Sequence, residues 1–397
     1  MKPDRCLRLS QEEMTIVDAP EPAEVLIPLN KSSSDSNRLR LKAGDHLITG
    51  NEILPGLFSP VSGTIINIEP LIMRDREVSS LRIKLDEKDE QDPEIKAEPD
   101  FLKMNPGEMV KILNRANLGF NESLESLDTV IVSIVDQDPL SMVQQQLWRE
   151  NKFLTLEGLR LIKHLLSARK IIFAIPLNLS ESGAEIPADV AEIFLVKPQY
   201  PMGLPEVLIA DISRSVDLGK CGFINVEKLI AAVVALKEGK PFVHKVITVV
   251  GKEWKKNLRI RIGTRIKDIF KDNELHDDDK LILGSPLRGE TVYHTDIPVG
   301  DDIDLICLQD SSQVILNENR PCMSCGKCVR VCPVQLDVNL ICRFSEFSLF
   351  ENCRELDVFD CIECGLCAYN CPSRRSLVQF IKLAKSELQK IKEEVES

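Results

Sequence analysis

A cysteine spacing that occurs twice in the last quarter of the printed sequence constrains this chain more than any other feature. Each occurrence reads C-x2-C-x2-C-x3-C-P. The first run comprises Cys322, Cys325, Cys328 and Cys332 before Pro333, and the second comprises Cys361, Cys364, Cys367 and Cys371 before Pro372. Eight of the 13 cysteines therefore lie in one short segment of an acidic chain, which is typical of a metal site in a reducing compartment and not of a disulfide framework.

The spacing predicts two [4Fe-4S] clusters with crossed ligands. Three cysteines at two-residue intervals form a tight loop on one side of a cubane, whereas the fourth lies too far round the turn and reaches the other cluster. We therefore predict that cluster 1 is bound by Cys322, Cys325, Cys328 and Cys371, and cluster 2 by Cys361, Cys364, Cys367 and Cys332. The crossing brings the clusters close together, which suits a relay of single electrons.

Two glycines support this interpretation, and one alternative stands against it. Gly326 and Gly365 each follow the second cysteine of a run, where the backbone must approach inorganic sulfide without a Cβ atom. The alternative is a pair of zinc sites, but zinc ligands usually occur as two separated CxxC or CxxH pairs, without a third cysteine and a C-P ending. The pattern therefore favours iron and sulfide.

The segment between the two runs, residues 334–360, predicts one or two helices. It is rich in apolar residues and contains neither glycine nor proline. It resembles the helical two-cluster ferredoxin domains of multi-subunit respiratory enzymes, and we place such a domain at residues 313–376. Cys342 and Cys353 lie within this segment, either as alternative cluster ligands or as buried structural cysteines.

Charge and hydropathy argue against two classes of function. The formal net charge of −12 repels phosphate backbones and predicts no nucleic-acid partner. The longest apolar run, residues 229–236, has eight residues, far fewer than the roughly 20 that a membrane helix needs. The first ten residues are charged and lack the apolar core of a signal peptide. We therefore expect a cytoplasmic chain that reaches a membrane only through a partner.

The first hundred residues predict a β module followed by a linker. Residues 1–85 alternate short apolar runs with turn signals and resemble a lipoyl-like barrel-sandwich hybrid. The SPVSGT turn at residues 59–64 carries no lysine for a prosthetic group, so we interpret the module as a scaffold. Residues 86–100 hold eight acids, two lysines and two prolines, which predicts a solvated acidic linker.

Residues 101–242 alternate strands and helices, which predicts a Rossmann-like α/β domain with a mostly parallel sheet. Strands are expected at residues 129–135, 170–175 and 192–196, and helices at residues 156–166 and 226–236. Such sheets often bind nucleotides at a glycine-rich turn between a strand and a helix. Gly119 is the one glycine of residues 114–123, and residues 201–205 contain no G-x-G. We therefore predict a sheet without a bound nucleotide.

The remaining segments predict a small α+β unit and a terminal helix. Residues 243–312 return to short strands, at residues 245–251, 258–263, 265–270 and 280–284, and end with residues 301–308. Residues 377–397 predict an amphipathic helix. Its apolar stripe comprises Leu377, Ile381, Ala384, Leu388, Ile391 and Val395. This stripe either docks a partner helix or packs on its own domain.

The order of these modules resembles that of the C subunits of Rnf membrane complexes, which are peripheral iron-sulfur subunits. The resemblance covers about residues 20–385. Besides the two cysteine runs it is carried by KAGDHLITGNEI (42–53), SPVSGTI (59–65), YPMG (200–203), GKPFVHKVITVVG (239–251) and IRIGTRIKDIF (260–270). It implies that residues 243–312 form a β-grasp domain of the soluble-ligand-binding type. The implied fold is a multidomain α+β and α/β protein that ends in an α-helical two-cluster ferredoxin domain.

In that family the α/β domain holds FMN and exchanges electrons with NAD(H), through a GxGGAGFP-like loop and an AECEP-like segment. Here the loop at residues 116–121 reads ANLGFN, in which only Gly119 and Phe120 match, and the second segment reads VDQDP at residues 135–139. The YPxGxE-like segment reads YPMGLP at residues 200–205. Side chains thus replace glycines where backbone must approach a phosphate. We therefore predict neither bound FMN nor bound NAD, assign no catalytic residue, and carry over only the eight cysteines.

The resemblance implies an electron-transfer subunit at the cytoplasmic side of the cell membrane, linked to ferredoxin and to Na⁺ or H⁺ movement. The departures from the FMN and NAD motifs predict that it does not use NADH. Implied partners are the other Rnf-type subunits, which contain flavin and iron-sulfur centres, and a multihaem cytochrome, as in some cytochrome-bearing methanogenic archaea. Two alternatives stay open: an NADH:ferredoxin oxidoreductase subunit with a divergent FMN site, and a soluble adaptor for a flavoenzyme or heterodisulfide-reductase-like partner.

Two arginines follow the last cysteine of the second run. We expect Arg374 and Arg375 to be exposed beside Cys371. There they would steer an acidic electron donor, raise the potential of the nearby cluster, or only be solvated.

Overall fold

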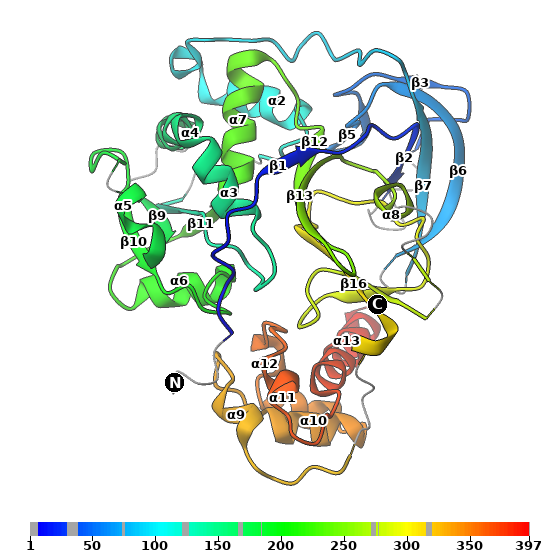
Figure 1. Ribbon diagram of the computed structural model, residues 1–397, viewed down its shortest axis with the longest axis vertical. Coiled ribbons are helices and arrows are strands. Elements are labelled where there is room, and N and C mark those ends of the chain that lie inside the picture. Colours follow the sequence, from blue (N-terminus) through cyan, green and yellow to red (C-terminus); the bar gives the residue numbers. More distant parts are fainter. Residues whose placement is uncertain are drawn as a thin grey trace.

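The computed structural model describes residues 7–29, 39–73, 76–120, 127–165, 170–183, 185–270, 275–276, 278–314 and 320–396. Within these residues the chain is a mixed α/β protein of several regions. A parallel sheet with its helices lies beside two other sheets (Figure 1). A helical region lies below them in Figure 1, where it contacts the parallel sheet on one side and the six-stranded sheet on the other. This arrangement places the cysteine runs next to segments that are far from them in the sequence.

An antiparallel sheet in the first part of the chain has the strand order β2-β7-β6-β3. Its strands are β2 (Glu24–Pro28), β7 (Arg76–Leu85), β6 (Gly63–Met73) and β3 (His46–Leu47), and the hairpin of β4 (Glu52–Leu54) and β5 (Leu57–Phe58) packs on the same core. Alternate side chains such as Leu81 and Ile83 point into this core, as a period of two requires. A Cβ atom on Gly63 would lie 2.2 Å from the Lys84 carbonyl oxygen, so the SPVSGT turn needs glycine there.

A second sheet is parallel throughout and has the order β10-β9-β8-β11. Its strands are β8 (Thr129–Ser133), β9 (Lys170–Pro176), β10 (Glu192–Val196) and β11 (Cys221–Asn225). Helices α2 (Pro106–Arg115), α3 (Val143–Glu150), α4 (Lys152–Leu165) and α7 (Val226–Glu238) cover one face, and α6 (Pro205–Ser213) covers the other. Every residue of β8 is buried because both faces are covered.

The sequence predicted most of this sheet. The strands expected at residues 129–135, 170–175 and 192–196 are confirmed as β8, β9 and β10, and the two expected helices as α4 and α7. The parallel pairing is confirmed as well. Strand β11 and helices α2, α3 and α6 have no counterpart among the predictions, because they are short or lack a clear apolar period.

The third sheet is mixed, with six strands in the order β1-β13-β12-β16-β14-β15. They are β1 (Ile16–Asp18), β12 (His244–Val250), β13 (Lys255–Arg261), β14 (Lys280–Leu283), β15 (Glu290–Val292) and β16 (Leu305–Gln309). The prediction of a strand at residues 265–270 is wrong, since these residues contain the short helix α8 (Ile266–Ile269). The Ile266 side chain is buried in the core of this sheet.

The first described residues do not belong to the antiparallel sheet, in contrast to the expected single β domain at residues 1–85. Residues 7–9 run beside residues 198–200, where Leu9 N–H donates to the Pro198 carbonyl (3.1 Å) and Tyr200 N–H donates to the Leu7 carbonyl (2.8 Å). Strand β1 then pairs in parallel with β13. The beginning of the chain therefore ties the parallel sheet to the six-stranded sheet.

The acidic segment at residues 86–100 packs on the protein, although a solvated linker was expected. Asp92 is buried and pairs with Arg115 Nη1 at 2.6 Å. Ile95 is 3% exposed, and Asp89 forms an ion pair with Arg261 of β13. The acids of this segment therefore serve in part to hold it against α2 and the six-stranded sheet.

The last region is helical, with α9 (Lys327–Arg330), α10 (Val338–Glu346), α11 (Phe350–Glu355), α12 (Leu366–Tyr369) and α13 (Leu377–Glu396). The helices predicted between the cysteine runs are confirmed as α10 and α11. The stripe of α13 packs on these two helices from Leu377 to Leu388, so this part lies on its own domain, whereas Ile391 is 37% exposed. No helix in the described part of the chain is long and apolar enough to span a membrane.

Candidate iron-sulfur centres

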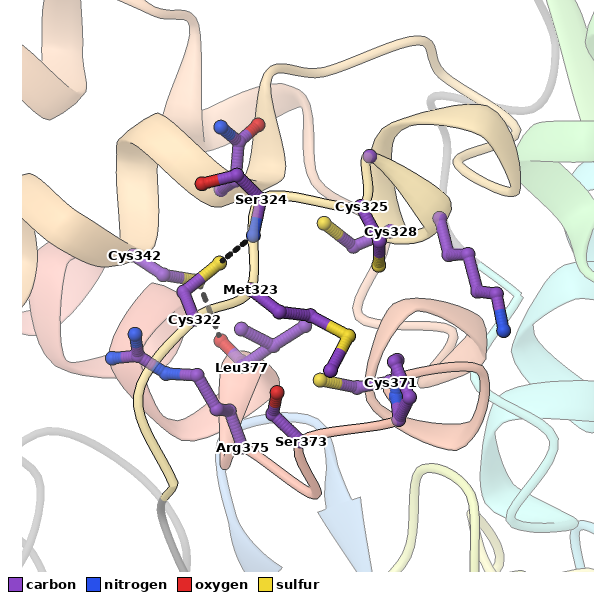
Figure 2. Close-up of a pocket in the computed structure, with 14 residues that line it drawn as sticks. Cys322, Met323, Ser324, Cys325, Cys328, Cys342, Cys371, Ser373, Arg375 and Leu377 are labelled. Carbon is purple, nitrogen blue, oxygen red and sulfur yellow. Dashed lines mark hydrogen bonds between the residues drawn. The ribbon is translucent and has the colours of Figure 1, made fainter.

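The eight cysteines of the two runs line two neighbouring cavities in the helical region. Cavity 1 is lined by Cys322, Cys325, Cys328 and Cys371 (Figure 2), and cavity 2 is lined by Cys332, Cys361, Cys364 and Cys367. Each cavity thus receives three cysteines of one run and the fourth of the other. These are the two sets into which the sequence divides them.

The two cavities are built by an internal repeat, in which each residue of the second half follows its counterpart by 39 positions. Helix α12 repeats α9, and α13 begins where the repeat of α10 would begin. Left-handed backbone conformations recur with the same offset. Ser324 (φ 53°), Gly326 (φ 65°) and Gln335 (φ 59°) correspond to Glu363 (φ 54°), Gly365 (φ 76°) and Arg374 (φ 47°). The same unusual loop is therefore made twice.

Backbone N–H groups donate hydrogen bonds to sulfur atoms of both cysteine runs. Ser324 N–H donates to Cys322 Sγ, and Glu363 N–H donates to Cys361 Sγ, both at 3.4 Å. Leu336 N–H donates to Cys332 Sγ, also at 3.4 Å. Hydrogen bonds from N–H groups stabilise negative charge on sulfur, so the loops suit thiolate ligands.

In the absence of a metal, burial disfavours the thiolate form of these cysteines, in contrast to the N–H groups, which favour it. It raises the pKa of Cys364 to about 11 and also raises the pKa of Cys328, Cys361 and Cys367. Without a positive centre these groups would therefore keep their protons. Iron binding would displace the protons, because the metal stabilises the thiolate form.

The thiols surround space and do not converge on a point. In the described part of the chain, no three His, Cys, Asp or Glu side chains are arranged to hold a single metal ion. Thiols placed around a cavity suit a cubane, whose irons lie at its corners.

Distant parts of the chain contact the cysteine loop of cavity 2. The Tyr200 hydroxyl donates a hydrogen bond to the Cys364 carbonyl. A Cβ atom on Gly365 would lie 2.0 Å from the Leu287 carbonyl oxygen, so only glycine allows this contact with the loop between β14 and β15. Cys364 and Leu366 also share an apolar cluster with Leu204 and other residues on the α6 side of the parallel sheet.

Cavity 1 lies nearer the surface. Cys322 is exposed, and the neighbouring Met323 side chain is 63% exposed. Arg374 is exposed as expected, but the expectation that Arg375 is exposed is wrong. Its side chain is 9% exposed, lines cavity 1 and pairs with Glu346 at 2.6 Å. The two adjacent arginines therefore have different environments.

The additional cysteines are free thiols where they are described. Cys342 lines cavity 1 and donates to the Leu377 carbonyl at 3.3 Å, and Cys353 donates to the Ile341 carbonyl at 3.4 Å. Both are buried. These hydrogen bonds favour structural roles for both, although Cys342 lines cavity 1 together with the predicted ligands of cluster 1. Cys6 lies outside the described residues.

The segments that correspond to the FMN and NAD motifs are packed into the protein. In the loop at residues 116–121, Ala116, Leu118 and Phe120 are buried in the core under α7, and Asn121 lies outside the described residues. Asp136 accepts hydrogen bonds from Gln144 N–H and Gln145 Nε2, both at 2.9 Å. Burial raises the pKa of Asp136 to about 6.

The remaining two of these segments contact each other. A Cβ atom on Gly203 would lie 2.0 Å from the Asp136 carbonyl oxygen, and Asp138 Oδ1 accepts a hydrogen bond from Ser285 Oγ at 2.7 Å. The side chains of residues 135–139 and 200–205 thus serve packing contacts at the carboxyl edge of the sheet. No sequence pattern indicated Ser285, Leu287 or Glu346 as neighbours of these sites.

Comparison with known proteins identifies similar chains. No family model matches the sequence. The chain is 27% identical over 385 residues to the C subunit of an ion-translocating oxidoreductase complex from Vibrio cholerae, covering 87% of this chain and 50% of that one. The C subunit of the same kind of complex from Serratia proteamaculans is 25% identical over 410 residues, covering 94% and 58%. This chain therefore spans about half to three fifths of the length of these relatives.

Solved structures give only a distant likeness. An NAD⁺-reducing [NiFe]-hydrogenase in the H₂-reduced state has a TM-score of 0.41 and 13% identity, covering 65% of this chain and 53% of that chain. The same enzyme in the air-oxidized state has a TM-score of 0.42 and 14% identity, covering 61% and 49%.

Proposed function

From its homology to the C subunits of ion-translocating oxidoreductase complexes, which confirms the resemblance stated from the sequence, we propose that this chain relays single electrons through two [4Fe-4S] clusters in an Rnf-type complex. The homologues support an electron-transfer subunit of such a complex. Ferredoxin as the electron partner, Na⁺ or H⁺ as the coupled ion, and a peripheral position at the cytoplasmic side of the membrane are parts of the proposal.

One observation carries this function: the crossed set of four cysteines at each cavity. Cluster 1 would be held by the four cysteines of cavity 1, and cluster 2 by those of cavity 2. When bound, these clusters supply the ability to accept and release one electron each. The repeated left-handed loops direct three thiols inward at each cavity, and the fourth arrives from the other half.

The residues around cavity 2 fix the cysteine loops relative to the sheets. Tyr200 holds the backbone of Cys364, and Gly365 permits the contact with Leu287. Such support matters because electron transfer depends on fixed distances and on small reorganisation of the surroundings. The chain's own contribution is therefore to hold the clusters, orient them and shield them from solvent, and we assign no catalytic residue.

The domains can be proposed on the same basis. We place a barrel-sandwich hybrid in residues 20–85, a Rossmann-like domain in residues 101–242, a β-grasp domain in residues 243–312 and a helical ferredoxin domain in residues 313–376. The strand orders of the three sheets support this division. Strand β1 modifies it, because this strand extends the sheet of the β-grasp domain.

We propose further that electrons neither come from nor go to NADH on this chain. The support is the packing of residues 116–120 into the core and the contact of Gly203 with Asp136, which use the two segments for internal contacts. The electron partner of the complex would then be ferredoxin at one end and a carrier such as a multihaem cytochrome at the other.

Cofactor analysis of anaerobically purified protein tests the proposal. We expect about eight iron and eight sulfide per chain, as two [4Fe-4S] clusters require, with neither zinc nor flavin in stoichiometric amount. About four iron would contradict the two-cluster assignment, and stoichiometric zinc would contradict both clusters. Stoichiometric FMN released on denaturation would instead favour an NADH-linked oxidoreductase subunit.

A further inference from the structure

The two cavities share a backbone but differ in the charges that line them. The repeat allows a comparison position by position. Lys327 of cavity 1 corresponds to Leu366, Ser324 corresponds to Glu363 of cavity 2, and Arg375 corresponds to Leu336. As a result, the residues that line cavity 1 include the two cations Lys327 and Arg375, whereas the charged residue that lines cavity 2 is Glu363.

Arg375 is the cation with the closest relation to cavity 1. Its Nη2 pairs with Glu346 at 2.6 Å, and its guanidinium carbon lies 5.5 Å from the centre of the Phe380 ring. These contacts hold the side chain against the cavity, on the side of Cys322 in Figure 2. The position of the Arg375 side chain is thus fixed by these contacts.

The Nε–H group of Arg375 has no hydrogen-bond partner among the described residues, although it is buried. Buried donors without a partner are rare, and each one calls for an explanation. A group held in cavity 1 would supply the missing acceptor, because the inorganic sulfides and thiolates of an iron-sulfur cluster accept hydrogen bonds.

The counter-charges differ between the cavities as well. At cavity 1, Glu346 compensates Arg375; its side chain is 35% exposed, about as much as the 33% of Glu363 at cavity 2, so solvent screens both acids alike. At cavity 2, Glu363 pairs with Lys385 at 2.8 Å, and Lys385 Nζ also donates to the Cys361 carbonyl at 2.6 Å. Glu363 also pairs with Lys382 at 3.7 Å. The lysines near cavity 2 do not line it, whereas the cations Lys327 and Arg375 line cavity 1 themselves.

We propose that Arg375 donates its Nε–H to the cluster of cavity 1 and thereby gives this cluster the higher reduction potential of the two. A buried positive charge and a hydrogen-bond donor both favour the reduced cluster, which carries one more negative charge. When the two clusters share one electron, it would therefore be found mainly on cluster 1, which lies nearer the surface, and cluster 2 would be oxidised. The inference depends on the proposed function, since it requires both clusters.

A redox titration monitored by electron paramagnetic resonance tests this on the full chain, purified anaerobically. Arg375→Leu installs the residue of the equivalent position in the other half. We expect it to retain eight iron and to shift the distribution of the electron about tenfold toward cluster 2, which corresponds to about 59 mV for one electron. The spectrum of a Cys322→Ser variant identifies which signal belongs to cluster 1.

Three further variants separate the charge from other effects. Arg375→Lys keeps the charge but loses the Nε–H, so it should give a smaller shift in the same direction. Glu346→Gln removes the counter-charge and should shift the electron toward cluster 1, a sign that damage to the fold would not produce. Arg343→Gln, a control on the exposed side of α10, should change the distribution far less because solvent screens it.

The outcomes distinguish the two claims. Full iron content with unchanged potentials in Arg375→Leu would overturn the role of Arg375 and leave the proposed function intact. A shift of Glu346→Gln toward cluster 2 would overturn it too, and this variant decides the matter if Arg375→Leu loses iron. Wild-type protein without two clusters would overturn the proposed function itself.

Discussion

The two halves of the cysteine region show the same backbone in two different settings. Cavity 1 lies near the surface, with Cys322 exposed, whereas the loop of cavity 2 is held by Tyr200 and Leu287 from two other regions. The repeat determines where the thiols point. Segments distant in the sequence determine which of the two loops is covered, so the direction of the thiols and the exposure of each loop have separate origins.

Removal of equivalent thiols should give the largest effect and should separate the cavities. Cys325→Ala and Cys364→Ala each remove one of four ligands, and we expect each to lose close to half of the bound iron. An added small thiol such as 2-mercaptoethanol should restore iron in Cys325→Ala only, because Cys325 is partly exposed whereas Cys364 is 7% exposed. Iron content per chain measures both effects. Equal restoration in the two variants would contradict the difference in access.

Equivalent glycines give the next test. Gly326→Ala and Gly365→Ala both place a side chain at positive φ, which costs roughly 1–2 kcal/mol. In Gly365→Ala the new Cβ also meets the Leu287 carbonyl, and we expect a further loss of about 2–3 kcal/mol from overpacking. In Gly326→Ala the nearest atom belongs to the flexible Arg330 side chain, 3.2 Å away. Unfolding midpoints in denaturant compare them, and equal losses would show that the Leu287 contact is not tight.

The support of cavity 2 should depend on pH through Asp136, whose carbonyl contacts Gly203 in the loop that carries Tyr200. Burial raises its folded pKa to about 6, so the folded state binds a proton more tightly than the unfolded state. The neutral form is favoured on folding, and stability should fall as pH rises from about 4 to about 6, by roughly 3 kcal/mol.

The variant Asp136→Asn tests whether stability falls with rising pH because of Asp136. The variant should lose that pH dependence and be more stable than wild type at pH 8, by up to about 3 kcal/mol. Gln145 Oε1 is buried without a partner in the described residues, so a flipped Gln145 amide accommodates the new donor. Melting temperatures at pH 5 and pH 8 measure the effect. A variant less stable than wild type at both values would show that the charged form of Asp136 is needed.

Tyr200→Phe should give the smallest effect. It removes the hydrogen bond to the Cys364 carbonyl while keeping the ring in the apolar cluster, which costs about 1 kcal/mol. Both clusters should remain at pH 7. Because the loop is held less tightly, we expect a chelator to remove iron from cluster 2 faster than in the wild type, with the rate for cluster 1 unchanged. Equally faster loss from both clusters would contradict the proposed difference between the cavities.

Sequence patterns were most informative where the geometry is local. The cysteine spacing divides the eight thiols into two sets, and each set lines one cavity; that the thiols bind clusters stays a prediction. Strands β8 and β9 were predictable because buried parallel strands are rich in branched apolar residues. Helix α3 was missed since three consecutive glutamines, Gln144 to Gln146, hide its burial.

Contacts between distant residues could not be predicted. Nothing in two adjacent arginines indicates that Arg375 turns inward to Glu346 while Arg374 stays at the surface, because this depends on where α10 lies. The contact of Gly365 with Leu287 likewise depends on the docking of a separate sheet. The packing of Asp92 and Ile95 was hidden because an acidic, proline-containing segment has the composition of a linker.

Strand β1 has a consequence for the order in which the molecule can assemble. Its three residues pair with residues 257–259, about 240 positions later in the chain, and Asp18 forms an ion pair with Arg259 at 2.8 Å. During synthesis this early segment cannot find its place until β13 has emerged, so the contact forms late and slowly. Until then β13 is an open sheet edge, available to any other extended strand. A newly made chain is therefore most prone to mispairing with a neighbour just before its own first strand closes that edge.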